Sequence, residues 1–152
     1  MEGDLVEALQ AHQYIVVELG HEKYALKISE IYEIIKLQKI TAVPNNKSFL
    51  EGVTNLRGKI VPIISLRKRF GLESSKKRKG ERIVVVQYKE EMIGVIVDGV
   101  SQVTRFTDIQ SSEDIVSGFD GYYFSGIGHS EEGLISILDV EHILDGMEVN
   151  ER

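Results

Sequence analysis

GVTNLRGKIVPIISL, residues 52–66, has two runs of strand-forming residues separated by Arg57 and Gly58. Valine, isoleucine and threonine favour strands, and glycine allows a tight reversal, so the stretch predicts a β-hairpin. It also places a cation at the turn. Solvation alone would account for this residue, but the planar guanidinium also suits pairing with a carboxylate that fixes a binding wall or contacts a partner. Glu33, within the apolar run 31–37, is the carboxylate that we expect to pair with Arg57.

Two blocks of the sequence recur in the same order. The strand pattern of residues 14–34 returns 69 positions later in residues 83–103, with apolar residues on apolar ones and polar turns on polar turns. The ends of the stretch 52–66 return 74 positions later, within residues 126–140. Two matched blocks at constant offsets indicate an internal duplication.

The duplication predicts a mainly β protein with a few short helices. Each half would supply about five short strands, which suit a small closed barrel better than an open sheet. We expect two such barrel subdomains related by a pseudo-twofold, over approximately residues 13–73 and 82–147 of a single domain 1–152. Strands can exchange between them. Residues 1–12 would be a tail or a short helix.

The two helices are predicted by capping residues. Ser65 can cap a turn over 66–70 that stops at Gly71, and Asp139 can cap a helix over 140–145. Within the strands, the first hairpin is expected to place Tyr24, Leu26 and Ile28 on one face. Pro62 lacks a backbone donor, which predicts that its strand lies at an edge or is bulged.

Composition excludes several classes of function. With no cysteine there is no disulfide and no thiolate ligand or nucleophile, and the four histidines lack the spacing of a metal site. No catalytic constellation is evident, so we expect no enzyme activity, no cofactor and no metal. The amino terminus lacks a signal-peptide pattern, and the apolar runs are shorter than the roughly 18 residues of a spanning helix. A cytoplasmic protein is expected.

A net charge of −6 argues against nucleic acid as the main partner. The basic run within residues 74–82 is interpreted as a solvated loop. A small barrel that binds nucleic acid through residues 76–79 is the less favoured alternative.

Four segments then make the sequence recognisable: YALKISEIYEII (24–35), FLEGVTNLRGKIVPIISL (49–66), GVIVDGV (94–100) and LISILDV (134–140). They closely resemble CheW, the chemotaxis coupling protein family, over approximately residues 13–147. The resemblance implies two SH3-like five-stranded barrels, in agreement with the duplication. It implies a non-enzymatic adaptor of a two-component system that joins membrane chemoreceptors to the histidine kinase CheA and is recruited to receptor arrays.

The resemblance also assigns roles to residues. Contact with the cytoplasmic tip of chemoreceptors, in a groove between the barrels, carries over to Ile31, Glu33, Arg57, Val100 and Val103. Contact with the regulatory domain of CheA is expected at barrel ends and neighbouring strands, for which the candidates are Val84, Val86 and Gly94. A CheW-like regulatory module of a larger kinase or coupling protein is the alternative, although the chain begins and ends close to the repeat.

Overall fold

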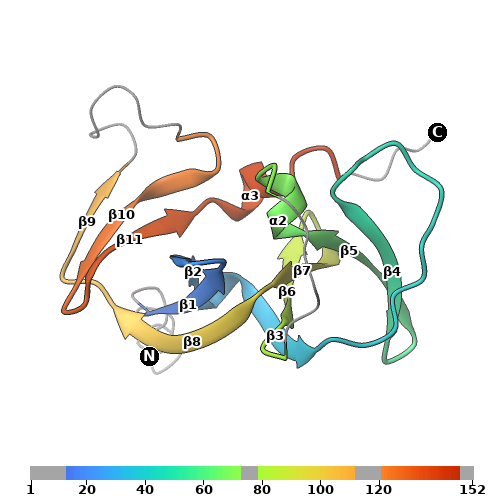
Figure 1. Ribbon diagram of the computed structural model, residues 1–152, viewed down its shortest axis with the longest axis horizontal. Coiled ribbons are helices and arrows are strands. Elements are labelled where there is room, and N and C mark those ends of the chain that lie inside the picture. The colour runs from blue at the N-terminus through green and yellow to red at the C-terminus, as the bar shows by residue number, and fades with distance from the viewer. Residues whose placement is uncertain (1–12, 73–78, 112–120, 148–152) are drawn as a thin grey trace. The chain divides into compact units, whose positions relative to one another are not determined.

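The computed structural model describes residues 13–72, 79–111 and 121–147. These residues form two β-sheets and three short helical segments. Figure 1 labels the strands in chain order. The chain divides into two compact units: unit 2 comprises Val17–Glu22 and Ile31–Val100, and unit 1 comprises the rest. The expected mainly β fold is confirmed, and the two sheets are consistent with two SH3-like subdomains. The predictions for residues 1–12 and for most of the basic run 74–82 fall outside the described residues.

Most of unit 1 is a six-stranded sheet. In spatial order its strands are β8 (Gly99–Arg105), β1 (Gln13–Leu19), β2 (Glu22–Lys27), β11 (Gly133–Leu138), β10 (Phe124–Ser130) and β9 (Asp108–Ser111). A 3-10 turn, η1 (Ile28–Glu30), follows β2.

Unit 2 contains a five-stranded sheet. In spatial order its strands are β3 (Ile31–Lys36), β6 (Arg82–Tyr88), β7 (Glu91–Val97), β5 (Lys59–Ser65) and β4 (Leu50–Leu56).

The two sheets exchange their hairpins. The β1–β2 hairpin from the first repeat joins β11 of the second repeat, because β2 and β11 pair in parallel at Tyr24–Ser136. The β6–β7 hairpin from the second repeat likewise joins β5 of the first repeat through parallel pairing at Gly94–Ile63. The contiguous spans 13–73 and 82–147 therefore describe the repeat in the sequence and do not describe the two sheets.

The apolar cores occupy corresponding positions of the repeat. The cluster in unit 1 consists of Tyr14, Val16, Ala25, Ile135 and Ile137, with Phe106 packed against it. The cluster in unit 2 consists of Val61, Ile63, Ile83 and Val85, and Leu37 is among the residues packed against it. The position equivalent to Ala25 is Gly94, where an added Cβ would lie 2.6 Å from side-chain atoms of Ile63 and Ile83. Glycine is thus needed because both neighbours are isoleucine.

The repeat also preserves an irregularity of the sheets. Register shifts place an extra residue in β4 before Gly52 and in β10 before Gly126. A Cβ at Gly52 would collide with the backbone of Thr41, and a Cβ at Gly126 would collide with the backbone of Gln110. Both glycines permit the close approach of a neighbouring backbone segment.

Both helix caps are confirmed. The Ser65 side chain accepts a hydrogen bond from the Lys68 amide at the start of α2 (Leu66–Arg69). The Asp139 side chain accepts one from the His142 amide at the start of α3 (Val140–Ile143). The expected helix over 140–145 is shorter than predicted, because Leu144 already caps it.

The expectation that the strand of Pro62 lies at an edge or is bulged at Pro62 is wrong. Its strand, β5, is interior, between β7 and β4, and the register shift of β4 lies elsewhere, beside Gly52. Val53, opposite Pro62, makes both of its backbone hydrogen bonds with Thr41. The Val53 carbonyl therefore needs no donor from Pro62. Parallel pairing with β7 begins only at Ile63. The missing donor therefore costs no ladder bond.

The predicted face of the first hairpin also needs correction. Ala25 and Leu26 are both buried although they are adjacent, whereas Tyr24 is half-buried. Ile28 lies in η1 and not in the strand. Strict alternation fails here because both faces of β2 are covered at Ala25 and Leu26.

Candidate functional site

The β4–β5 turn holds Arg57 in an unusual conformation. Arg57 has φ 51° and Gly58 has φ 87°, as a two-residue type I′ turn requires. The first position of such a turn favours asparagine, aspartate or glycine, and a larger side chain in the left-handed region costs about 1–2 kcal/mol. The Asn55 side chain accepts a hydrogen bond from the Gly58 amide at 2.9 Å, which supports the turn.

Arg57 forms the ion pair expected from the sequence. Its guanidinium donates to the Glu33 carboxylate on β3, so the turn of one hairpin is tied to a strand 24 residues away. The Arg57 side chain remains 62% exposed, and that of Glu33 is 24% exposed. Exposed pairs contribute little to stability, so this pair fixes a direction for the guanidinium more than it stabilises the fold.

Tyr32, beside this pair, was missed by the sequence reasoning. A register shift between Ile31 and Glu33 leaves Tyr32 as an extra residue in β3, and it is 57% exposed. Bulges re-aim side chains, and exposed aromatic residues are frequent energetic anchors of interfaces. The only signal in the sequence was an aromatic residue beside the expected carboxylate.

The remaining residues of the expected receptor site lie on two strands. Ile31 begins β3 and is partly buried. Val100 and Val103 share β8, where Val100 is partly buried and Val103 is 53% exposed. The structure therefore brings Glu33 and Arg57 into contact, with Ile31 on the strand of Glu33.

The three residues nominated for kinase contact are buried. Val84 and Val86 are 0% and 1% exposed on β6, and Gly94 lies beneath Ile63 and Ile83. Buried positions of this kind hold strands in register and do not present side chains to a partner. Their expected direct contact is thus not available in the folded chain.

A second ion pair in unit 2 is mostly buried. Arg67, after the N-cap of α2, donates to Asp98 at 2.8 Å, with side-chain exposures of 15% and 7%. Asp98 also accepts a hydrogen bond from the Gly20 amide at 2.6 Å. The hydrogen bond with Asp98 raises the pKa of Arg67 above its usual value, which outweighs the opposing effect of burial. We call this group the Asp98 clamp; it joins three segments that are distant in sequence.

Comparison with known proteins identifies the family. The family model for the CheW-like domain matches residues 13–148. The chain belongs to the CheW-like family. It is 37% identical to a protein named chemotaxis protein CheW from Helicobacter pylori over 134 residues, which cover 87% of this chain and 81% of the relative. It is 33% identical to the protein of the same name from Thermotoga maritima, with 97% of each chain covered.

A solved CheW structure has the same fold. The scaffolding protein TtCheW from Thermoanaerobacter tengcongensis superposes with a TM-score of 0.80 at 32% identity, covering 93% of this chain and 96% of that one. These CheW relatives support a coupling-adaptor role in chemotaxis signalling. Within the described ranges, no helix of this CheW-like chain is long and apolar enough to cross a membrane.

Proposed function

We propose that this CheW-like protein is a non-enzymatic adaptor that couples the cytoplasmic tips of chemoreceptors to the histidine kinase CheA. It would act in the cytoplasm and be recruited to receptor arrays at the membrane. The observation that carries the proposal is Arg57, an exposed and ion-paired arginine held in a left-handed turn of a chain from a scaffold family. Strained backbone positions of this kind cluster at functional sites.

Receptor contact would use the face of unit 2 around the Glu33–Arg57 pair, with Ile31 and Val100 as apolar contributors; Val103, in unit 1, would be a further contact with the receptor. Val103 supplies exposed apolar surface, whereas Ile31 and Val100 are partly buried and would contribute less. Tyr32 adds an exposed aromatic ring on the strand of Glu33. A few apolar anchors beside a fixed charge are the usual source of affinity in a small interface.

Kinase contact would use exposed strand ends in the five-stranded sheet. Val84, Val86 and Gly94 would act indirectly, by keeping β6 and β7 in register. Among the described residues, no group of three or more histidine, cysteine, aspartate or glutamate side chains could hold a metal ion. The chemistry of phosphorylation would belong to the kinase.

The test is co-sedimentation of the full chain with a receptor cytoplasmic fragment and purified CheA. Arg57→Gly should weaken receptor capture by about tenfold, as expected for loss of one interface anchor. Its free energy of unfolding should stay within about 1 kcal/mol of the parent, because relief of the left-handed arginine opposes loss of the ion pair. The matched control is Lys89→Gly, in the turn between β6 and β7, where Lys89 has φ 49°. Unchanged capture by Arg57→Gly would refute the proposed receptor site.

A further inference from the structure

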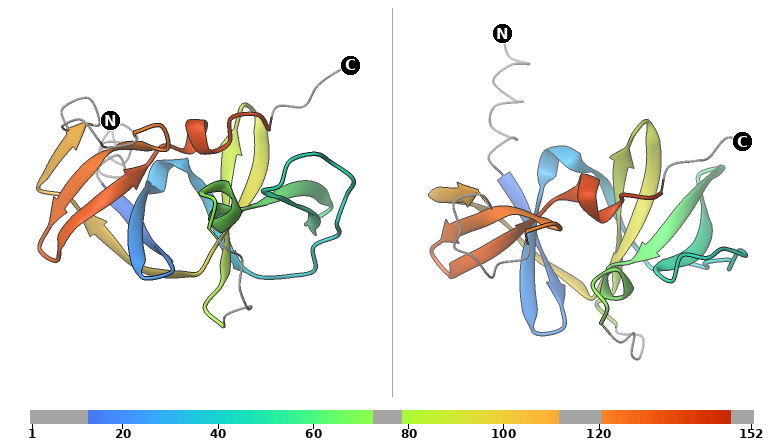
Figure 2. Two further views of the ribbon diagram at one scale, coloured as in Figure 1. Left: turned by 45° about the horizontal axis from the view of Figure 1, so that its top comes forward. Right: turned by 90° about the horizontal axis from the view of Figure 1, so that it is seen from above.

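The hairpins β4–β5 of unit 2 and β10–β11 of unit 1 are equivalent in the repeat. The two units differ in the segment that pairs with the first strand of each hairpin. In unit 1, β9 pairs with β10 over four successive positions. The equivalent segment of unit 2 pairs with β4 only at Thr41–Val53. Figure 2 shows the connection 37–49, drawn in teal, as a wide loop beside β4.

Side chains replace the missing part of the ladder. In unit 1 the Thr107 amide donates to the His129 carbonyl. At the equivalent place in unit 2, the Gln38 side-chain amide donates to the Asn55 carbonyl at 2.7 Å. The Thr54 hydroxyl donates to the Lys39 carbonyl at 2.6 Å and accepts from the Gln38 side chain at 2.9 Å. These bonds hold the loop at a fixed distance from β4.

One difference between the repeats lies at this separation. Thr54 occupies the position of Gly128 in the other repeat, where the absence of a Cβ lets the ring of Phe106 pack against the strand. Thr54 fills that space with a buried side chain that is bonded to the loop. The gap in the ladder is therefore built by particular residues and is not a frayed edge.

The gap is an open groove with a volume of about 360 Å³. We call it the Ile60 groove; its lining residues are Gln38, Lys39, Thr41, Val53, Thr54, Asn55 and Ile60. Its volume is near the lower end of the roughly 300–1,000 Å³ of ligand sites.

The lining favours an apolar side chain as the occupant. Ile60 presents exposed apolar surface to the groove, since it is 66% exposed. The side chains of Gln38, Thr54 and Asn55 are already bonded within the chain, so they do not form a convergent polar set for a small polar ligand.

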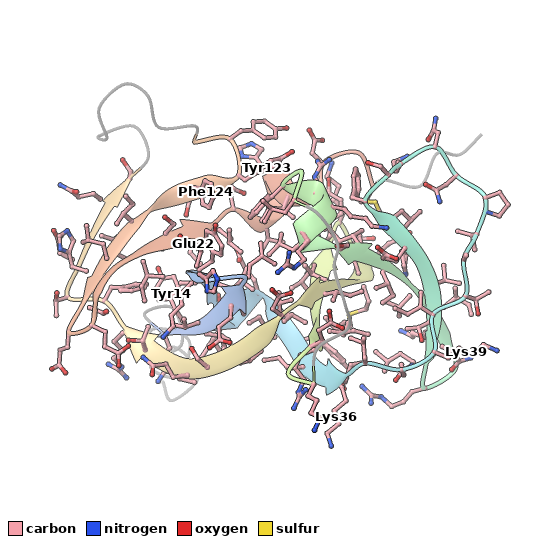
Figure 3. All side chains as sticks on the ribbon, viewed as in Figure 1. Tyr14, Glu22, Lys36, Lys39, Tyr123 and Phe124 are labelled. Atoms are coloured by element: carbon pink, nitrogen blue, oxygen red, sulfur yellow. The ribbon has the colours of Figure 1, made fainter. Side chains whose placement is uncertain are left out.

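Two lysines lie in or next to the groove lining. Lys39 lines the groove, and Lys59 precedes Ile60 in β5. Figure 3 shows Lys39 projecting away from the ribbon. Within the described part of the chain, these two lysines make no ion pair, and the groove lining contains no acidic residue. These lysines contrast with the net charge of −6 of the whole chain.

We propose that the Ile60 groove binds an acidic segment of a partner protein that inserts one apolar side chain against Ile60 and Val53. The flanking carboxylates of that segment would face Lys39 and Lys59. The groove lies on the same β4–β5 hairpin as Arg57. A peptide titration needs no receptor, so its failure is distinguishable from failure of the receptor contact proposed above.

The experiment is an NMR titration of the isotopically labelled full chain with a short synthetic peptide, one leucine flanked by aspartates and glutamates. The amide signals of Val53, Thr54 and Ile60 should shift in a saturable manner. The same peptide with serine in place of leucine, or with lysines in place of the acids, should bind at least about tenfold more weakly. Equal binding of either control peptide, or no saturable shift, would overturn the proposal.

Matched variants locate the binding. Ile60→Asp and Lys39→Glu should each weaken the peptide by about fivefold or more. Leu134→Asp, at the equivalent position on β11 and 64% exposed, should leave the affinity unchanged. Circular dichroism excludes unfolding. If the same amides shift on concentrating the chain alone, with dimers in sedimentation, a second copy is the occupant and the proposal fails.

Discussion

The two repeats share their apolar framework but differ in their charges. In the described part of unit 2, the ion pairs Arg57–Glu33, Arg67–Asp98 and Lys68–Glu51 link segments that are distant in sequence. The equivalent positions in unit 1 hold Glu131 and Gln102, Glu141 and Ser29, and His142 and Ser125. None of these pairs can form an Arg–carboxylate or Lys–carboxylate bond. The duplication thus preserved packing, whereas these three ion pairs of unit 2 have no counterpart at the equivalent positions of unit 1.

Core positions and exposed charged positions differ in how strongly folding constrains them, which explains why packing is shared by the two units and these ion pairs are not. Core residues must fill the same volume in each copy, because cavities and overpacking both destabilise a close-packed interior. Exposed charges contribute little to stability, so they can change in one copy without unfolding it. The buried Asp98 clamp is the exception, and it gives the largest expected effect.

Asp98→Ala should lower the free energy of unfolding by about 3 kcal/mol, because it leaves the largely buried Arg67 without its carboxylate. Ser29→Ala, at the equivalent exposed position, should change it by less than about 0.5 kcal/mol. Urea unfolding of both variants measures the difference. Equal effects would mean that the clamp does not distinguish the units.

Gly94→Ala should destabilise the protein by about 1–3 kcal/mol, because the new methyl group overpacks Ile63 and Ile83. Ala25→Gly, the reverse change at the equivalent position, should cost about 1 kcal/mol through lost burial and greater chain entropy. Thermal unfolding provides both values. A neutral Gly94→Ala would contradict the close packing of the core in unit 2.

The ion pair equivalent to Arg57–Glu33 can be introduced into unit 1 to test whether the two turns are interchangeable. Glu131→Arg with Gln102→Glu would create an exposed pair and change stability by less than about 1 kcal/mol. Added to Arg57→Gly, this pair should not restore receptor capture, since the binding contact depends on the face of unit 2. Restored capture in co-sedimentation would show that the two turns are interchangeable.

The smallest expected effect on stability is that of changing Glu30 of unit 1, whose counterpart in unit 2 is Gly99. Burial raises the pKa of Glu30, Lys27 opposes the rise, and Asp139 and Glu141 add to it. Folded Glu30 thus binds its proton more tightly than the unfolded chain does, so its contribution to stability falls as pH rises above about 4.3, the ordinary value for glutamate. Glu30→Gln should raise the melting temperature at neutral pH and leave it nearly unchanged at lower pH. An equal gain at both pH values would contradict this assignment.

Much of the fold could be predicted from local patterns. The hairpins and both caps follow from residues close together in sequence, and the 69- and 74-residue offsets follow from comparing one part of the sequence with another. The Glu33–Arg57 pair was also predicted, because one carboxylate stood out in an apolar run. Tyr32 and the Asp98 clamp were not, since a bulge and a contact between distant segments have no local signature.

The sequence by itself determined the duplicated apolar pattern, its turns and its caps, because these depend on neighbours within a few residues. Only the tertiary structure decided that each β-hairpin pairs with strands of the other repeat. It also decided that Val84, Val86 and Gly94 are buried and that Thr54 opens a groove beside β4. Parallel pairing between strands far apart in sequence depends on packing across the whole sheet, which no local pattern records.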